Sequence, residues 1–208
     1  MKNEQEALIH RITGFSDAVF AVAITLLVLD IHTAELPALL SNADFSSALL
    51  NTLPKFWSFA LSFFVIGRYW VSHVRFFQFF RTIQEEEKPR LLFMTLVLLF
   101  FVVLLPFSTS LISAHPEQQL AVAVYAGNIA AGGFAQYVMW LYVTREYMQK
   151  APKQENRLLY YQSMRLLVTP LVFLLSIPLA FYNVHLAEYF WILILFVRTQ
   201  IVKRQRSL

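Results

Sequence analysis

Long apolar stretches recur along this chain and constrain its fold more than any other feature. Six can be marked, each with the roughly 17–20 apolar-rich residues that a membrane-spanning helix needs. Backbone polar groups in lipid must be satisfied within their own segment, so each stretch is expected to be a helix. The sequence predicts an all-α integral membrane protein, a single repeat and one domain over residues 1-208, with helices at about 7-30, 46-80, 90-113, 118-147, 158-182 and 186-203.

Composition agrees with this prediction and excludes several function classes. Hydrophobic residues make up 58% of the chain and charged residues only 14%, against about 25% charged residues in soluble domains. The net charge of +4 comes from cations that flank apolar stretches, where membrane orientation explains them, so no nucleic-acid partner is expected. The chain has no cysteine, which excludes disulfides and thiolate metal sites.

The segments between the apolar stretches alternate in charge. Residues 31–45, 109–120 and 180–190 contain no Lys or Arg. The other connections and the C-terminal end are basic, with Arg75, Arg81, Lys88, Arg90, Arg145, Lys150, Lys153, Arg157, Lys203, Arg204 and Arg206. Cytoplasmic loops carry the excess of cations, so both termini are expected in the cytoplasm.

The first predicted helix has two different faces. At about 100° per residue, one narrow stripe gathers Arg11, Phe15, Ala18, Val22, Leu26 and Leu29. Thr25 lies about 60° to the side of this stripe, and Ser16 and Asp17 point to the opposite half of the helix. We refer to these six residues as the apolar stripe, although Arg11 is charged.

Asp17 needs a partner, because an unpaired carboxylate in lipid is highly unfavourable. The second helix offers Trp70 and His73, which share a face at i, i+3 and can both donate hydrogen bonds. The predicted topology puts them at the same depth as Asp17. We therefore expect a buried polar cluster of Ser16, Asp17, Trp70 and His73 that orients the apolar stripe.

These residues also carry a resemblance to a known family. Arg11-x-x-x-Phe15-Ser16-Asp17 resembles the Arg-x-x-x-Phe-Ser-Asp signature of the transmembrane protein 175 family of potassium channels, and Trp70-x-x-His73-x-x-x-Phe77 resembles its second-helix motif. The layout is similar to the bacterial branch, with one repeat per chain. The resemblance implies a homotetramer in the lipid bilayer, with four first helices around a central pore and no cofactor or bound metal beyond the permeant potassium ion.

The family's pore is narrowed by aliphatic rings and not by a carbonyl filter. Carried over to this sequence, the resemblance implies a constriction at Val22, further rings at Leu26 and Leu29, and Thr25 as the hydroxyl associated with selectivity. Val22 departs from the Ile or Leu common at this position by one methylene. A narrow apolar ring blocks ions by dewetting, and its widening admits water and a cation. The expected function is a potassium-permeable cation channel.

Parts of the sequence resemble three other functional classes. Asp17 and His73 are also compatible with a proton-conducting or cation-coupled transporter, since intramembrane Asp/His pairs relay protons in pumps. Glu85-Glu86-x-x-x-Arg90 matches a membrane protease motif, but it lies in a basic loop, so no enzyme is expected. His10, His32, His115 and His185 are scattered over loop positions, which disfavours a metal site. A structural membrane protein without transport is the remaining alternative.

Overall fold

The computed structural model describes residues 2–31, 42–80, 88–150 and 152–206, and these are almost entirely helical. The N-terminal helix is α1 (Lys2–Leu26), continued by the 3-10 helix η1 (Leu27–Asp30). The helices that follow are α2 (Asn42–Asn51), α3 (Leu53–Phe80), α4 (Lys88–Ala114), α5 (Gln119–Lys150), α6 (Lys153–Tyr182), α7 (Val184–Phe190) and α8 (Leu193–Arg206). Glu85 and Glu86 of the protease-like motif, and His32, lie outside the described residues.

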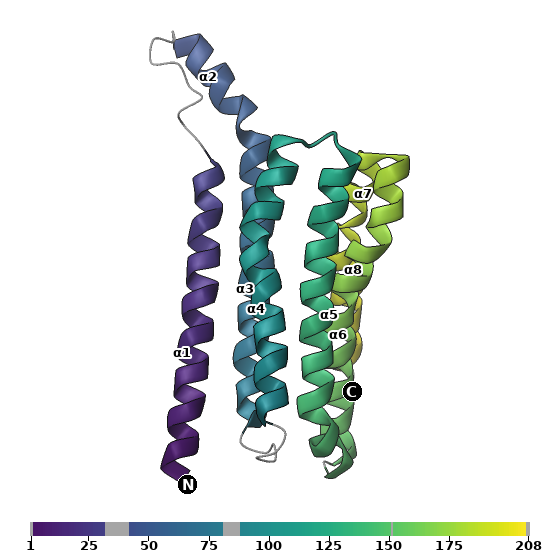
Figure 1. The fold of residues 1–208 in the computed structure, drawn as a ribbon. Helices are drawn as coiled ribbons and strands as arrows, with labels where there is room; N and C mark the ends of the chain where they lie inside the picture. Colours follow the sequence, from purple (N-terminus) through teal and green to yellow (C-terminus); the bar gives the residue numbers. More distant parts are fainter. Residues whose placement is uncertain (1, 32–41, 81–87, 151, 207–208) are drawn as a thin grey trace.

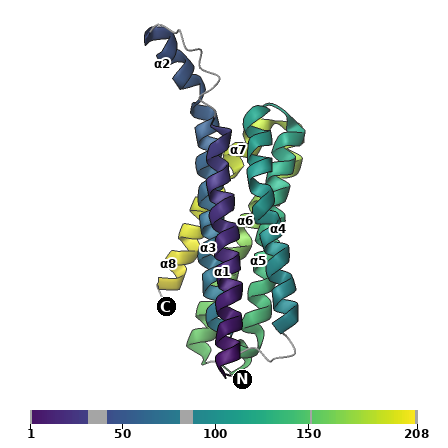
Figure 2. The same cartoon turned by 60° about the vertical axis from the view of Figure 1, so that its left-hand side comes forward.

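The long helices form one bundle of roughly parallel and antiparallel rods (Figure 1). The start of α1, the end of α3, the start of α4, the end of α5 and the start of α6 lie at one end, and α8 runs towards that end. α1 packs against α3 and α4, whereas α5 packs most extensively on α6. α2 projects beyond the opposite end of the bundle in both views (Figure 2).

Four stretches are long and apolar enough to cross a membrane: His10–Leu29, Pro89–Ala114, Glu155–Tyr182 and Val184–Arg204. The chain is therefore a membrane protein. α3 and α5 have 28 and 32 residues, which is also longer than the roughly 20 that a span requires. Neither helix is among the four candidate stretches, so their length alone supports a crossing.

The stretch predicted at 186-203 is divided into α7 and α8, and Val184–Arg204 is one candidate membrane span. The chain turns at Trp191 and Ile192, between α7 and α8. The Trp191 indole packs 5.0 Å from the Phe173 ring, and its Nε1 donates to Ser176 Oγ over 2.9 Å. The backbone there keeps helical angles but closes i→i+3 hydrogen bonds, from Trp191 N to Glu188 O and from Ile192 N to Tyr189 O. No Pro or Gly marks the change. The stretch predicted at 46-80 is likewise interrupted at Thr52, between α2 and α3.

Buried hydroxyls and small residues join the helices of the bundle. Ser62 Oγ of α3 lies 2.7 Å from Thr109 Oγ1 of α4 and 2.9 Å from Tyr125 Oη of α5. In the α5–α6 interface, a methyl group added at Gly133 would lie 3.0–3.2 Å from the Pro170 ring. Only a glycine lets these two helices approach so closely.

Candidate pore-lining helix and its anchor

α1 uses one face for packing within the chain and leaves the other uncovered. Phe20, Ala23 and Leu27 are at most 2% exposed and belong to the core with α3 and α4. Val22, Leu26 and Leu29 are 56%, 42% and 62% exposed. The 3-10 winding from Leu27 to Asp30 turns by about 120° per residue, so Leu29 departs slightly from the α-helical register used in the sequence analysis.

The remaining members of the apolar stripe are exposed as well. Arg11, Phe15 and Ala18 all lie on the uncovered side of α1. The stripe therefore runs for most of the helix length without a covering element in the described part of the chain. An apolar face of this length on a membrane helix is covered either by lipid or by another protein chain.

Thr25 sits at the edge of the stripe, and its side chain is also exposed. Its hydroxyl donates to the Val22 carbonyl oxygen over 2.9 Å. This bond to the helix's own backbone consumes the hydroxyl proton, so the lone pairs of Oγ1 are directed away from the helix. Thr25 thereby offers an oxygen acceptor, suited to a cation, on an otherwise aliphatic surface.

A hydrogen bond joins Asp17 to α3. Trp70 Nε1 donates to Asp17 Oδ1 over 2.8 Å. Trp70 is 42% exposed and Asp17 is exposed, so the bond lies at the edge of the α1–α3 interface and not deep within it. It fixes the rotation of α1 about its own axis relative to α3.

Ser16 and His73 are buried beside this bond but take no part in it. Ser16 is 0% exposed and His73 1% exposed. Within the described part of the chain, neither Ser16 Oγ nor the two His73 ring nitrogens have a hydrogen-bond partner. The His73 ring is instead surrounded by Phe20, Phe76 and Phe77, with ring centroids 5.5, 6.3 and 4.9 Å away. His73 therefore acts here as an aromatic packing residue.

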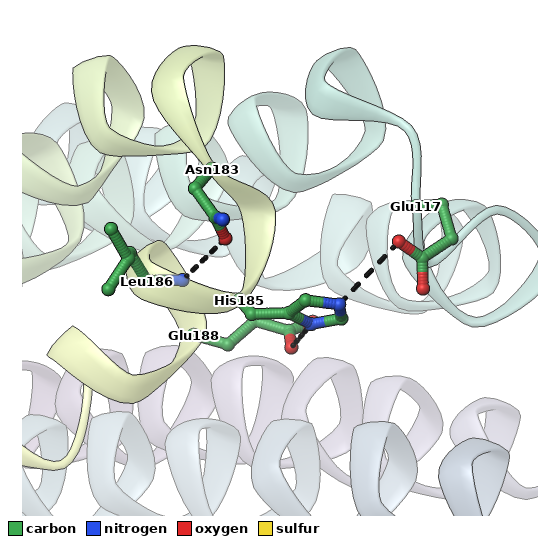
Figure 3. A network of polar contacts seen from close by, with 5 residues as sticks. All are labelled: Glu117, Asn183, His185, Leu186 and Glu188. Carbon is green, nitrogen blue, oxygen red and sulfur yellow. Dashed lines mark hydrogen bonds and ion pairs between the residues drawn. The ribbon is translucent and has the colours of Figure 1, made fainter.

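A second polar group lies at the opposite end of the bundle. Figure 3 shows the His185 ring of α7 between Glu117, in the connection from α4 to α5, and Glu188. Its Nε2 and Nδ1 lie 3.7 Å from the respective carboxylate oxygens. The described residues contain no group of three His, Cys, Asp or Glu side chains arranged to hold a metal ion.

The structure also brings together residues that the sequence analysis did not single out. Arg68 on α3, Arg165 on α6 and Arg198 on α8 lie within electrostatic range of one another, on the side of the bundle away from α1. Each falls inside an apolar stretch. An ionisable side chain in such a stretch is a signal of function by itself, and that signal was available in the sequence.

Comparison with known proteins identifies the class. The family described as "Endosomal/lysosomal potassium channel TMEM175" matches residues 11–106. A potassium channel of Chamaesiphon minutus is 33% identical over 70% of this chain and 72% of its own length. A potassium channel of Streptomyces collinus is 32% identical over 65% of this chain and 64% of its own length.

Solved structures agree on the fold. The crystal structure of a lysosomal potassium-selective channel TMEM175 homologue from Chamaesiphon minutus superposes with a TM-score of 0.72 and 26% identity, over 94% of this chain and 98% of that one. The potassium channel MtTMEM175 has the same fold at a TM-score of 0.57 and 19% identity, with 93% of each chain covered.

The fold and these relatives place the chain among membrane ion channels and not among enzymes. Apolar helices, together with relatives that are potassium channels, support cation transport across a membrane. The chain belongs to the TMEM175 family.

Proposed function

We propose that the protein is a potassium-permeable cation channel in which four copies of α1 surround a central pore. The uncovered apolar stripe of α1 is the observation that carries this proposal. The relatives at about one-third identity are potassium channels. A single exposed helix face cannot enclose a pore, so the proposal requires a homotetramer of about 97 kDa, four times the 24.2 kDa of the chain.

In this arrangement, Val22, Leu26 and Leu29 form successive aliphatic rings, and Val22 forms the constriction. Aliphatic rings offer no ligands to an ion, so they control conduction by excluding or admitting water. The Thr25 ring supplies four oxygen acceptors next to the constriction. Selectivity then depends on the width at Val22 and on these oxygens, and a filter of backbone carbonyls is not required.

The wider arrangement of the chain is part of the same proposal. Six spans follow if α3 and α5 cross the membrane together with the four most apolar stretches. Basic residues gather where α3, α5 and α8 end and where α4 and α6 begin. This end of the bundle is therefore proposed to face the cytoplasm, in a bacterial-type inner membrane. Arg11 lies at the same end of the apolar stripe, so it would face the cytoplasmic mouth of the pore.

Proton conduction is the second candidate. A relative from Danio rerio, 23% identical over 64% of this chain and 24% of its own length, is an "Endosomal/lysosomal proton channel TMEM175". A relay through Asp17 and His73 is disfavoured, because no hydrogen bond connects them in the described structure and His73 is enclosed by phenyl rings. A water-filled pore that also leaks protons remains compatible with the same residues.

Flux of potassium and sodium in proteoliposomes tests the pore assignment. Val22→Asn is expected to hydrate the constriction, to raise flux and to reduce the preference for potassium over sodium. Val103→Asn is a matched control: it is the same substitution at a site that is 55% exposed, against 56% for Val22, but it lies on α4. Unchanged flux with Val22→Asn, or an equal change with Val103→Asn, would remove α1 from the pore.

A further inference from the structure

The side of the bundle away from α1 carries an apolar groove that the proposed pore does not use. The groove has a volume of about 470 Å³ and lies among α3, α6, α7 and α8. Its walls include Leu61, Val65, Phe173, Trp191 and Leu195. The volume lies within the roughly 300–1,000 Å³ typical of ligand sites, and the walls are suited to a hydrocarbon chain.

One end of this groove is strongly basic. Arg68 of α3 and Arg198 of α8 both line it. Arg165 of α6 and the exposed Arg75 of α3 lie within electrostatic range of Arg68, so four positive charges from three helices converge there. Arg165 also has a buried Nε without a hydrogen-bond partner.

Nothing in the described part of the chain neutralises these charges. No carboxylate among the described residues lies within ion-pair distance of Arg68, Arg165 or Arg198. Glu188 lines the groove too, but it shares a neighbouring hollow with Trp57 and lies 3.7 Å from His185 Nδ1. Trp57 and Arg68 are about 16 Å apart along α3 at 1.5 Å per residue, so Glu188 belongs to the far end.

Converging guanidinium groups beside an apolar groove repel one another and need an anion. Arg68 and Arg165 are each about 18 Å from the basic end of their helices, and Arg75 lies nearer to that end. Arginine side chains at this depth extend towards the headgroup region while their stems remain on apolar surface. A phosphate there accepts paired hydrogen bonds from the planar guanidinium groups.

We propose that the groove binds one anionic diacyl phospholipid of the cytoplasmic leaflet. Its phosphate is held by Arg68, Arg165 and Arg198, and one acyl chain lies along Leu61, Val65 and Leu195 towards Trp191. Charge complementarity selects this occupant, since a zwitterionic lipid leaves the converging cations uncompensated. The site is separate from the proposed pore, and its test does not depend on ion flux.

Retention of lipid by the purified full-length protein tests this proposal. The protein is equilibrated in mixed micelles of phosphatidylglycerol and phosphatidylcholine, and the bound lipid is counted by native mass spectrometry. Phosphatidylglycerol is expected to be retained preferentially. The double variant Arg68→Gln/Arg198→Gln is expected to lower this preference by about tenfold or more. Arg90→Gln/Arg157→Gln removes the same charge from exposed positions elsewhere and is expected to leave the preference unchanged.

Two further measurements keep the proposal testable if the groove double variant folds poorly. Leu195→Trp keeps every arginine but fills the groove, and it is expected to reduce the retained lipid. Phosphatidylglycerol with brominated acyl chains is expected to quench the fluorescence of Trp191, and this part of the quenching is expected to be lost in Trp191→Phe. Brominated phosphatidylcholine is expected to quench Trp191 less.

Four results would overturn the assignment. Equal retention of the two lipids would show that the groove does not select an anionic lipid. An equal loss of the preference in both double variants would show that general surface charge causes it. Displacement of the lipid by inorganic phosphate alone identifies a simple anion site. Absence of Trp191 quenching by either brominated lipid in the assembled protein means that a second copy of the chain covers the groove.

Discussion

Trp70 Nε1 donates a 2.8 Å hydrogen bond to Asp17 Oδ1, and this bond joins the pore-lining candidate α1 to α3. Asp17 and Val22 are five residues apart on α1. The residue that orients the helix is therefore separate from the exposed residues of the apolar stripe. A rotation of α1 by one residue, about 100°, would put Ala21 or Ala23 at the position on the uncovered side that Val22 holds. The bond therefore stabilises the rotation of α1 in which Val22 faces outward.

Trp70→Phe is expected to lower stability by about 1 kcal/mol, because it removes a hydrogen bond to a charged acceptor at a partly exposed site. The larger effect is expected on assembly, since α1 loses its rotational restraint. The fraction of tetramer after detergent extraction measures this. Asp17→Asn should have a smaller effect, because its amide oxygen still accepts from the indole. Normal assembly with altered ion selectivity would instead place Asp17 in the pore.

His73→Leu is expected to leave stability unchanged or to raise it by up to about 1 kcal/mol. It removes two buried ring nitrogens that lack partners and keeps an apolar side chain among Phe20, Phe76 and Phe77. His73→Ala is expected to lower stability by about 2–4 kcal/mol and to reduce the tetramer yield, because it leaves a cavity. Thermal unfolding of both variants distinguishes packing from polar anchoring, and a strongly destabilised His73→Leu would show that the assembly supplies a hydrogen-bond partner.

Thr25→Val is expected to preserve folding and to lower the potassium-to-sodium flux ratio by about threefold or more, since it removes the oxygen acceptors beside the constriction. Thr199→Val is the matched control. Thr199 on α8 is also exposed, and its hydroxyl also donates to its own helix, to Leu195 O over 2.6 Å. A flux ratio that is insensitive to Thr25→Val would leave selectivity to the aliphatic rings alone.

Gly133→Ala is expected to destabilise the α5–α6 pair by about 1–3 kcal/mol, because its methyl group overpacks against the Pro170 ring. Gly127→Ala on the same helix is the control, since its nearest neighbour is the flexible Ile177 Cδ1 at 4.0 Å. Denaturation in detergent measures the difference. Equal stabilities would indicate that α6 moves to accept the methyl group.

The membrane class, the charge alternation and the division of the first helix into two faces follow from the sequence by itself. Hydrophobicity and the 3.6-residue period are local properties, so they can be read without knowing any neighbour. Val22 and Leu26 were placed on one face by this period, and both side chains are uncovered in the structure.

Only the tertiary structure decided which side chains meet. The sequence places Trp70 and His73 at the same membrane depth as Asp17, so it does not say which of them is the partner. The packing of α1 on α3 gives the hydrogen bond to Trp70 and encloses His73 in phenyl rings. The tertiary structure also divides the last apolar stretch at Trp191 and gathers Arg68, Arg165 and Arg198 from helices distant in sequence. Such contacts depend on the angle and rotation of each packed helix, which no single segment encodes.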